Sequence, residues 1–500
     1  MPETLIATLR EKLGTVCDLR SAARLLEWDQ ETYMPPKAAE ERAQQLATLS
    51  ALAHSLFVSP EIGALLEKLI EKKDKLSQDD AVFVDVVRYD YERARRLPDT
   101  FVHSFTLETS RALQVWIEAR KRSDFSMFLP CLERVVALNR EKAEYLGYAK
   151  SPYDALLEDF ERGMSVETIR PLFQELAEGL TKLVARISAR PAKAHPSWLA
   201  GEWPEVAKLE FSKRVLTDLG YDMEAGRQDK SVHPFSTSIG LCDVRITTRT
   251  TPDDLFKGLM ATIHECGHAL YSQGHDPKDQ RTPLLDGASL GTHESQSRLW
   301  ENFIGRSLPF WRHYLPVLRQ YFPGRLDHVC PENVYEELNR VVPSCIRVDA
   351  DECTYNLHIF LRFEIEVDLI ENQVSSKEVP EIWNEKMKAY LGIDVPNAAQ
   401  GCLQDIHWSH GAFGYFPTYA LGNIYAAQFL NKMTSDIPSL WDQVASGDFS
   451  AILAWLREKV HRHNRRKLAA EILREATGQD VSVTYFLNYL EKKYSDLYNL

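Results

Sequence analysis

The feature that most constrains the fold of this chain is the pentapeptide His264-Glu265-Cys266-Gly267-His268, which lies inside a stretch with helical spacing of apolar residues. Residues four apart lie on one face of a helix, so both imidazoles can bind one metal ion while the glutamate stands beside them. Burying two imidazoles and a carboxylate together requires compensation, which a cation supplies. The motif therefore predicts a zinc site, and the fold must bring a third ligand to this helix.

The helix that carries the motif has recognisable ends. Thr251 is the predicted N-cap, Pro252 occupies a position where a missing N–H costs nothing, and two acidic residues follow at the positive end of the helix dipole. Gly274 predicts the C-terminal end. Cys266 lies two residues from each histidine and points to another face, so we interpret it as a packing residue.

Glu294 is the candidate third ligand. A catalytic zinc takes three protein ligands and keeps one open position. The turn-rich segment from Gly274 to Gly287 can reverse the chain and place a second helix beside the first. An arbitrary glutamate is usually a solvated surface acid, but His293 precedes this one and apolar residues follow it. We therefore predict a Zn²⁺ site formed by His264, His268 and Glu294, with Co²⁺ as an alternative metal.

Helices are predicted along most of the remaining chain, because apolar residues recur at spacings of three and four with turn signals between the segments. Between Ser236 and Thr250 the pattern instead alternates as in a strand, which predicts a small antiparallel sheet with an exposed edge. The predicted helices of the first half are Met1 to Leu25, Lys37 to Phe57, Pro60 to Lys75, Gln78 to Leu97, Phe101 to Arg122, Met127 to Gly147, Val166 to Arg190 and Glu205 to Leu219.

Composition excludes several classes of partner. The net charge is −13, whereas a protein that binds nucleic acid normally presents a basic face. The basic run Arg462 to Lys467 is interpreted as a solvated helix face. We see no secretory signal and no stretch of membrane-spanning length, and the eight cysteines form no C-x-x-C pair. We therefore expect a cytoplasmic protein that binds neither nucleic acid nor membranes.

Six short motifs occur in order along the second half of the chain. They are His233-Pro234-Phe235, Asp243-Val244-Arg245-Ile246-Thr247, His264 to His268, His293-Glu294-Ser295-Gln296, Ile346-Arg347-Val348-Asp349-Ala350-Asp351 and Gly401-Cys402-Leu403-Gln404-Asp405-Ile406-His407-Trp408. This set resembles the motifs of the carboxypeptidase Taq family of metallocarboxypeptidases. Segments Glu27 to Pro35 and Ser151 to Leu157 resemble that family too, so the resemblance covers nearly the whole chain.

The resemblance implies a mainly α fold with a deep central groove, similar to the neurolysin and angiotensin-converting enzyme group. No glycine- or proline-rich linker divides the chain, so residues 1–500 are expected to form one catalytic domain with two lobes around the groove. The family further implies a homodimer that trims single residues from peptides with a free carboxyl end. An exposed sheet edge beside the groove could pair with the backbone of such a peptide.

Catalytic roles follow from the chemistry of peptide hydrolysis. Glu265 adjoins the metal without binding it, so it is the predicted general base. The oxyanion requires a donor opposite Glu265, and His407, Tyr415 and Tyr419 are the candidates, with no basis in the sequence for choosing among them. Buried tyrosines are more often packing residues than catalytic ones.

Recognition of a terminal carboxylate is best served by a planar, bidentate guanidinium. Arg347 is the first candidate, because the resemblance places the substrate terminus near its motif. Arg245 is the second, with organisation of the sheet as its alternative role, and His233 is a further candidate for substrate binding from the first motif.

One position departs from related glutamate zincins, in which an acid four residues beyond the glutamate ligand orients the first histidine. Here that position is Arg298, so the partner of the first histidine must come from elsewhere, for instance Asp286 or a carbonyl group.

Two other functions use the same scaffold. An endo-acting oligopeptidase or dipeptidyl carboxypeptidase would share the metal ligands, and a non-catalytic binding protein would not need Glu265.

Overall fold

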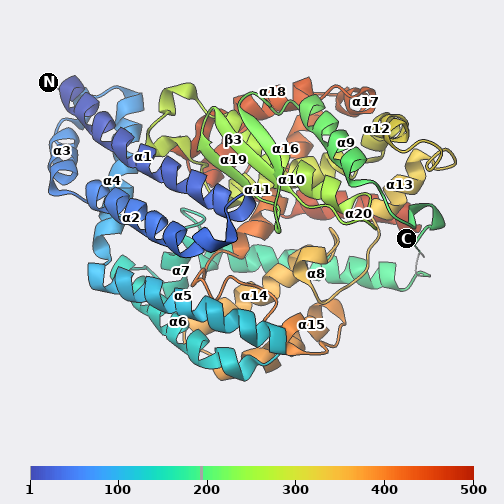
Figure 1. Cartoon of the computed structure of the whole chain (residues 1–500), viewed down its shortest axis with the longest axis horizontal. Coiled ribbons are helices and arrows are strands. Elements are labelled where there is room, and N and C mark those ends of the chain that lie inside the picture. Colours follow the sequence, from blue (N-terminus) through green and yellow to red (C-terminus); the bar gives the residue numbers. More distant parts are fainter. Residues whose placement is uncertain (1, 192–194) are drawn as a thin grey trace.

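The computed structural model describes residues 2–191 and 195–500, and helices dominate it, as the sequence predicts (Figure 1). The helices are α1 (Pro2–Thr32), α2 (Ala39–Phe57), α3 (Pro60–Ile70), α4 (Gln78–Arg96), α5 (Asp99–Arg122), α6 (Phe125–Leu146), α7 (Pro152–Leu157), α8 (Val166–Ser188), α9 (Glu205–Asp218), α10 (Lys257–Gln273), α11 (Leu290–Arg298), α12 (Leu308–Tyr321), α13 (Pro331–Leu338), α14 (Tyr355–Ile370), α15 (Val379–Leu391), α16 (Pro417–Asp436), α17 (Leu440–Ser446), α18 (Ser450–Lys459), α19 (Ala469–Thr477) and α20 (Thr484–Tyr498).

The helices predicted in the first half of the chain are all present, with ends that differ by a few residues. The largest differences are in α1 and α3. Helix α1 continues seven residues beyond Leu25 to Thr32, because the buried Trp28 extends its packed face. Helix α3 ends at Ile70 rather than Lys75. Leu69 is its last buried residue, and the charged residues that follow offer no apolar side chains to pack against the core.

The sheet is mixed, and the expectation of an antiparallel sheet is wrong. Strands β1 (Gly226–Lys230), β2 (Ser236–Gly240) and β3 (Asp243–Thr248) lie in the order β1-β3-β2. Strand β2 pairs with β3 antiparallel, whereas β1 pairs with β3 parallel. Strand β1 is polar and lacks alternation. It joins the sheet where the Tyr221 hydroxyl donates to the carbonyl oxygen of Val244 at 2.6 Å.

The helix that carries the histidines begins later than predicted. It starts at Lys257 with Phe256 as its N-cap residue, and the side chain of Asp254, rather than that of Thr251, accepts the backbone N–H groups of Phe256 at 2.8 Å and Lys257 at 2.6 Å. The carbonyl oxygens of Thr251 and Asp254 accept hydrogen bonds from the ammonium group of Lys208 in α9. This contact holds the preceding segment as a loop. The helix ends at Gln273, before Gly274, as predicted.

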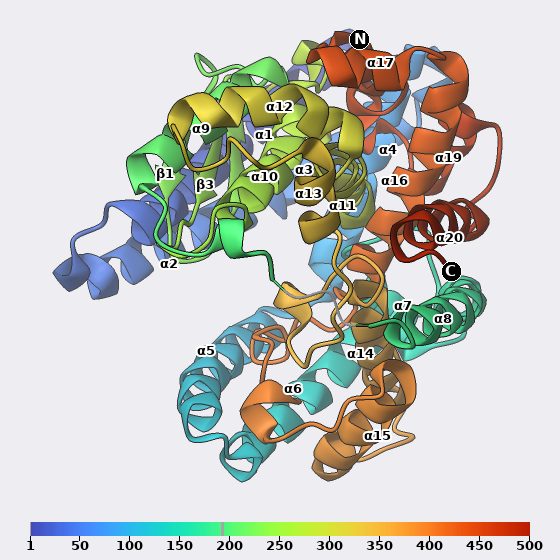
Figure 2. The ribbon, with the colours of Figure 1, turned by 90° about the vertical axis from the view of Figure 1, so that its right-hand side faces the viewer.

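Two hydrophobic cores organise the chain. A large core includes buried residues from the central and C-terminal helices, and a smaller one lies among α1, α2, α3 and α4. In Figure 2 the sheet, α9, α10 and α12 lie above α5, α6, α14 and α15. The deep groove, the two lobes and the relationship to neurolysin remain predictions.

The basic run near the C-terminus is not a solvated helix face. It forms a 3-10 turn, η10 (His461–Arg466), in which His461 and Asn464 are buried. Arg465 pairs with Asp90 of α4 at 2.7 Å, and Arg466 pairs with the fully buried Asp279. These arginines have buried or partly buried carboxylate partners, so they connect separate parts of the chain instead of facing water.

One helical stretch, Pro36–Ile70, is long and apolar enough to cross a membrane by length and composition, which differs from the expectation that no stretch would be. It contains α2 and α3, with a break at Val58 and Ser59. Only 28% of its most apolar window is buried. Soluble proteins contain helices that pass the same test, so this stretch alone does not indicate a membrane span, and the absence of a membrane partner remains a prediction.

Candidate functional site

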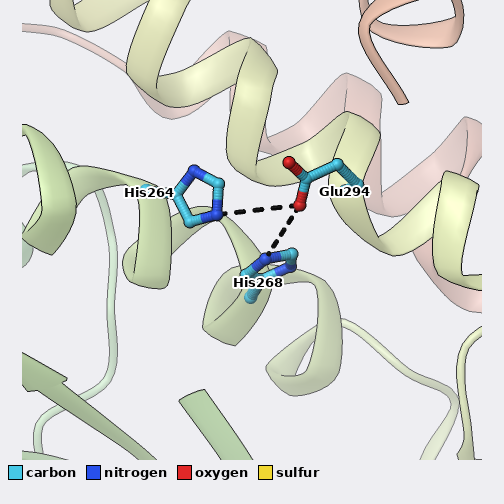
Figure 3. A group of neighbouring side chains, drawn as sticks. All are labelled: His264, His268 and Glu294. Carbon is cyan, nitrogen blue, oxygen red and sulfur yellow. Dashed lines mark ion pairs between the residues drawn. The ribbon is translucent and has the colours of Figure 1, made fainter. Parts of the chain in front are cut away.

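Helices α10 and α11 bring the three predicted metal ligands together (Figure 3). Glu294 Oε2 lies 3.6 Å from His264 Nε2 and 3.4 Å from His268 Nε2. One ligand atom from each residue lies within 4.8 Å of the others, an arrangement that could hold a metal ion. Helical periodicity within α10 and the reversal of the chain before α11 thus produce the predicted cluster.

Glycines allow α11 to approach its neighbours closely enough for Glu294 to reach the histidines. A Cβ atom on Gly267 would lie 2.6 Å from the carbonyl oxygen of Gln296, and one on Gly422 of α16 would lie 2.6 Å from Cγ of Glu294. Helix α11 is therefore packed between α10 and α16 at near backbone contact. Cys266 is fully buried, as expected for a packing residue.

The two histidines have different partners at Nδ1. His264 Nδ1 lies 2.9 Å from Glu301 Oε2, and His268 Nδ1 lies 2.6 Å from His293 Nδ1. Glu301 therefore takes the orienting role for which Asp286 was a candidate. Asp286 does not do so, because it is paired with Arg24 at 3.1 Å.

The electrostatics of the cluster suit a cation. Burial opposes ionisation of Glu294, but Arg298 and the two imidazoles outweigh it and hold its pKa well below the usual range. The pKa of Glu301 is depressed in the same way against burial, by His264 and Arg298. Both Nδ1 atoms are engaged, so Nε2 is the ring nitrogen of each histidine left to bind a metal ion. Two imidazole nitrogens and one carboxylate oxygen are the donors that a divalent zinc-type ion prefers.

Glu265 lies beside this cluster without being one of its three ligands. It is 7% exposed, and burial raises the pKa of its carboxyl group despite the opposing effect of His264 and His268. The Ser236 side chain of strand β2 is hydrogen-bonded to it. A buried carboxylate with a raised pKa is suited to accepting a proton.

A second cluster contains two arginines and one aspartate. Arg347 Nε and Nη2 lie 3.0 and 2.8 Å from Asp405 Oδ1, and Arg362 Nε lies 2.7 Å from Asp405 Oδ2. Burial opposes ionisation of Asp405, but the two guanidinium groups hold its pKa far below the usual range. Arg362 is fully buried, which lowers its pKa to about 10. The cluster has one more positive than negative side chain.

Tyr355 connects the two clusters. Arg298 donates a hydrogen bond to Glu294, and its Cζ atom lies 4.3 Å from the centre of the Tyr355 ring. On the other side, Arg347 Nη1 donates to the Tyr355 hydroxyl at 3.2 Å. Arg298 and Tyr355 therefore form a continuous chain of contacts between Glu294 and Arg347.

The model of the carboxypeptidase Taq (M32) metallopeptidase family matches residues 8–494. The chain belongs to this family. It is therefore a peptide hydrolase of the metallocarboxypeptidase type.

Two curated carboxypeptidases and a solved structure are similar to this M32 chain over nearly its whole length. It is 41% identical to carboxypeptidase 1 of Bacillus subtilis, over 98% of this chain and 97% of that one. It is 43% identical to thermostable carboxypeptidase 1 of Thermus thermophilus, over 99% of both chains. A crystal structure of an M32 carboxypeptidase from Deinococcus radiodurans matches with a TM-score of 0.97 and 38% identity, covering 99% of this chain and all of that chain.

The oxyanion candidates of this M32 chain lie near both clusters. The charge of Glu294 contributes to the pKa values of Tyr415 and Tyr419, and burial, the larger effect, raises the pKa of Tyr415 to about 12. His407 Nε2 is 3.3 Å from the Tyr419 hydroxyl, and burial lowers the pKa of His407 to about 3. At neutral pH the tyrosines are therefore hydroxyl donors and the histidine is uncharged.

The two other substrate-binding candidates are placed differently. Arg245 forms a bidentate pair with Asp243, at 2.7 and 2.9 Å, and its Cζ lies 4.2 Å from the centre of the Trp28 ring. These contacts favour its alternative role in organising the sheet. His233 is exposed, and within the described ranges its ring makes no hydrogen bond.

Glu301 and Tyr355 were missed by sequence reasoning. Glu301 could have been found, because it lies seven residues after Glu294, two turns along the same helix face. It belongs to a π-helical segment, η6 (Leu299–Gly305), that continues α11. Tyr355 gave no local signal, since its position depends on the approach of α14 to α11.

Proposed function

We propose that this metallocarboxypeptidase is zinc-dependent and releases single amino acids from the carboxyl ends of peptides. The observation that carries the proposal is Tyr355, which contacts Arg298 beside the metal ligands and Arg347 beside Asp405. An exopeptidase needs a cation at a short, fixed distance from the scissile bond. Here Arg298 and Tyr355 connect Glu294 to Arg347 through direct contacts, which supports binding of a terminal residue close to both clusters.

His264, His268 and Glu294 would hold the metal through the three atoms described above. When bound, a zinc-type ion supplies Lewis acidity that polarises a carbonyl group and lowers the pKa of water. Glu265 accepts the proton of the attacking water and returns it to the leaving amine. Its burial favours this role, because a raised pKa brings the carboxyl group closer to the pKa of a useful base.

Arg347 would bind the terminal carboxylate of the substrate. Its guanidinium carries five N–H donors, and Asp405 and Tyr355 accept from three of them. The others can form a charge-assisted pair with a second carboxylate. Arg362 is too deeply buried to touch the substrate, but its charge offsets Asp405 and leaves Arg347 with net attraction for an anion. Arg245 and His233 remain secondary candidates.

The developing oxyanion would receive a hydrogen bond from Tyr415, Tyr419 or His407. The raised tyrosine pKa values keep both hydroxyl groups protonated at neutral pH, which supports their use as donors. His407 Nδ1 has no hydrogen-bond partner in the described part of the chain, so the histidine also stays a candidate.

The wider setting of the enzyme also remains a proposal. We infer a cytoplasmic homodimer that acts on peptides with a free carboxyl end, with Zn²⁺ as the metal and Co²⁺ as an alternative. The eight cysteines are free, which suits a reducing compartment.

Strand β2 is an edge strand next to Glu265, which supports pairing with a peptide backbone. Exposed Leu52 and Leu56 of α2 offer an apolar face to a second copy, and light scattering tests the dimer.

Mass spectrometry of a peptide of defined sequence tests the activity, with and without a chelator. The proposal predicts a ladder of products that lose one residue at a time from the carboxyl end, and no ladder after metal removal. Internal fragments or dipeptide losses would favour an oligopeptidase or a dipeptidyl carboxypeptidase. No cleavage under any metal loading would favour a binding protein, although such a protein would not need Glu265.

A further inference from the structure

Arg298 connects a metal ligand to the residue that orients another ligand. Its Nε atom donates to Glu294 Oε1 at 2.7 Å, and its Nη1 atom donates to Glu301 Oε2 at 3.3 Å. Glu301 Oε2 also lies 2.9 Å from Nδ1 of His264. Glu294, Arg298, Glu301 and His264 therefore form a ring that the metal would close.

The two carboxylate oxygens of Glu294 face different partners. Oε2 faces the Nε2 atoms of His264 and His268 at 3.6 and 3.4 Å. Oε1 is turned to the guanidinium of Arg298, whose side chain is 13% exposed and stacks over Tyr355. With its guanidinium fixed by two carboxylates and a ring, Arg298 has little freedom to release Oε1.

We propose that Arg298 is a positioning residue that restricts Glu294 to binding the metal through Oε2 alone. A carboxylate can bind a metal through one or two oxygens, and a second oxygen would raise the coordination number and crowd the position that a catalytic site keeps open. The guanidinium also offsets part of the charge of Glu294, so the bound ion retains more of its Lewis acidity. The inference rests on the metal site proposed above.

This role has a consequence that a purely structural role lacks. Removing Arg298 eliminates a positive charge near the metal and frees a second oxygen of Glu294. Both changes favour binding of a cation, so the metal should bind at least as tightly while catalysis becomes slower. A residue that merely supported the fold would weaken metal binding and activity together.

Cobalt-loaded protein tests the proposal through a spectroscopic signature, because the visible absorption of Co²⁺ weakens as its coordination number rises. Arg298→Met is compared with the wild type and with Arg306→Met. Arg306 is the matched control, since within the described residues it donates to Glu301 Oε1 at 2.9 Å and forms no hydrogen bond or ion pair with Glu294. Metal affinity is measured by competition with a chelator, and circular dichroism reports the fold.

The expected result is a weaker cobalt band in Arg298→Met with a dissociation constant no larger than that of the wild type, and a wild-type band in Arg306→Met. Arg298→Lys should restore the band, because an ammonium group at that position also reaches a carboxylate oxygen. If Arg298→Met does not fold, Arg298→Gln replaces it.

An unchanged band in Arg298→Met overturns the proposal, as does a loss of affinity of about 10–100-fold, the range usual for an outer partner of a ligand. An equal change of the cobalt band in Arg306→Met also overturns it, because the loss of one positive charge near the site would then explain both variants. Failure of the wild type to bind cobalt at His264, His268 and Glu294 would instead refute the metal site itself, together with this inference.

Discussion

The metal-ligand cluster and the arginine cluster have opposite balances of charge. Around the metal ligands, Glu265, Glu294 and Glu301 outnumber Arg298 and Arg306 by one. In the other cluster, Arg347 and Arg362 outnumber Asp405 by one. The first surplus suits a cation and the second suits an anion, so a peptide terminus and a metal ion can be held side by side.

The two clusters also differ in how they are supported. The metal ligands lie on α10 and α11, whose backbones are nearly in contact at Gly267. Arg347 lies in the short turn η7 (Arg347–Asp349), and Asp405 lies in a loop. Helices fix the atoms proposed to bind the metal, whereas buried ion pairs fix the atoms proposed to bind the substrate. The arginine cluster should therefore depend more strongly on each of its charges.

The largest expected effect tests the metal side of this comparison. Glu265→Gln removes the proposed base and none of the ligands, so turnover should fall by about 10²–10⁴-fold, the usual contribution of general acid–base catalysis. Elemental analysis should show unchanged metal content. A variant that had lost its metal, or that cleaved peptides at the wild-type rate, would remove Glu265 from this role.

Asp405→Asn tests the arginine cluster and should affect the fold as well as activity. It leaves two buried guanidinium groups without their carboxylate, which costs about 3–5 kcal/mol of the free energy of unfolding. Thermal or denaturant unfolding measures the loss. Asp394→Asn is the control, because the pair of Asp394 with Lys388 is exposed and exposed pairs contribute about 0.2–1 kcal/mol.

The same variant has a predicted pH dependence. The pKa of Asp405 is depressed in the folded state, so its stabilising contribution is fully present above the unfolded pKa of about 3.9 and is lost as the pH falls through the folded value. The difference between wild type and Asp405→Asn should thus be constant between pH 7 and 5 and shrink below about pH 4. A difference that already shrank between pH 7 and 6 would contradict the assigned pair.

Arg347→Ala separates substrate recognition from catalysis. It should reduce kcat/KM on peptides with a free carboxylate by about 2–5 kcal/mol of transition-state stabilisation. Slow cleavage of amidated peptides should change little, because they lack the partner charge. Equal losses on both substrates would assign Arg347 to the fold or the transition state, and the same comparison on Arg245→Ala would follow.

Glu301→Gln should have the smallest of these effects. It weakens the partner of His264 Nδ1 without removing a ligand, so metal affinity should fall by about 10–100-fold. Asp286→Asn is the control, since Asp286 pairs with Arg24 and should leave the affinity unchanged. If the two variants bound metal equally well, Glu301 would not orient the histidine.

Helical periodicity explains why the sequence predicted the metal-ligand cluster. His264 and His268 are four residues apart, and a reversal of the chain was enough to place Glu294 beside them. The same reasoning predicts most helices of the fold, since each depends on a local pattern of apolar residues. Glu301 was accessible to this reasoning as well, because it lies seven residues after Glu294 on the same helix face.

Features that depend on contacts between distant segments were not predictable. Strand β1 has no apolar alternation and is held in the sheet by its parallel pairing with β3. The sequence around Arg465 and Arg466 predicts solvated side chains, because their partners Asp90 and Asp279 lie far away in the chain. Asp405 belonged to a recognised motif, yet nothing local indicated that it would accept hydrogen bonds from both Arg347 and Arg362.

The close packing at Gly267 and Gly422 also bears on how the enzyme acquires its metal. With α11 held at both positions, Glu294 has little room to swing away, so the ordering of the ligands is completed when the chain folds. Uptake of an ion then requires loss of its water shell but little rearrangement of the protein. One ion can replace another without unfolding, and supply in the cell, as much as the chain itself, would decide which metal the enzyme carries.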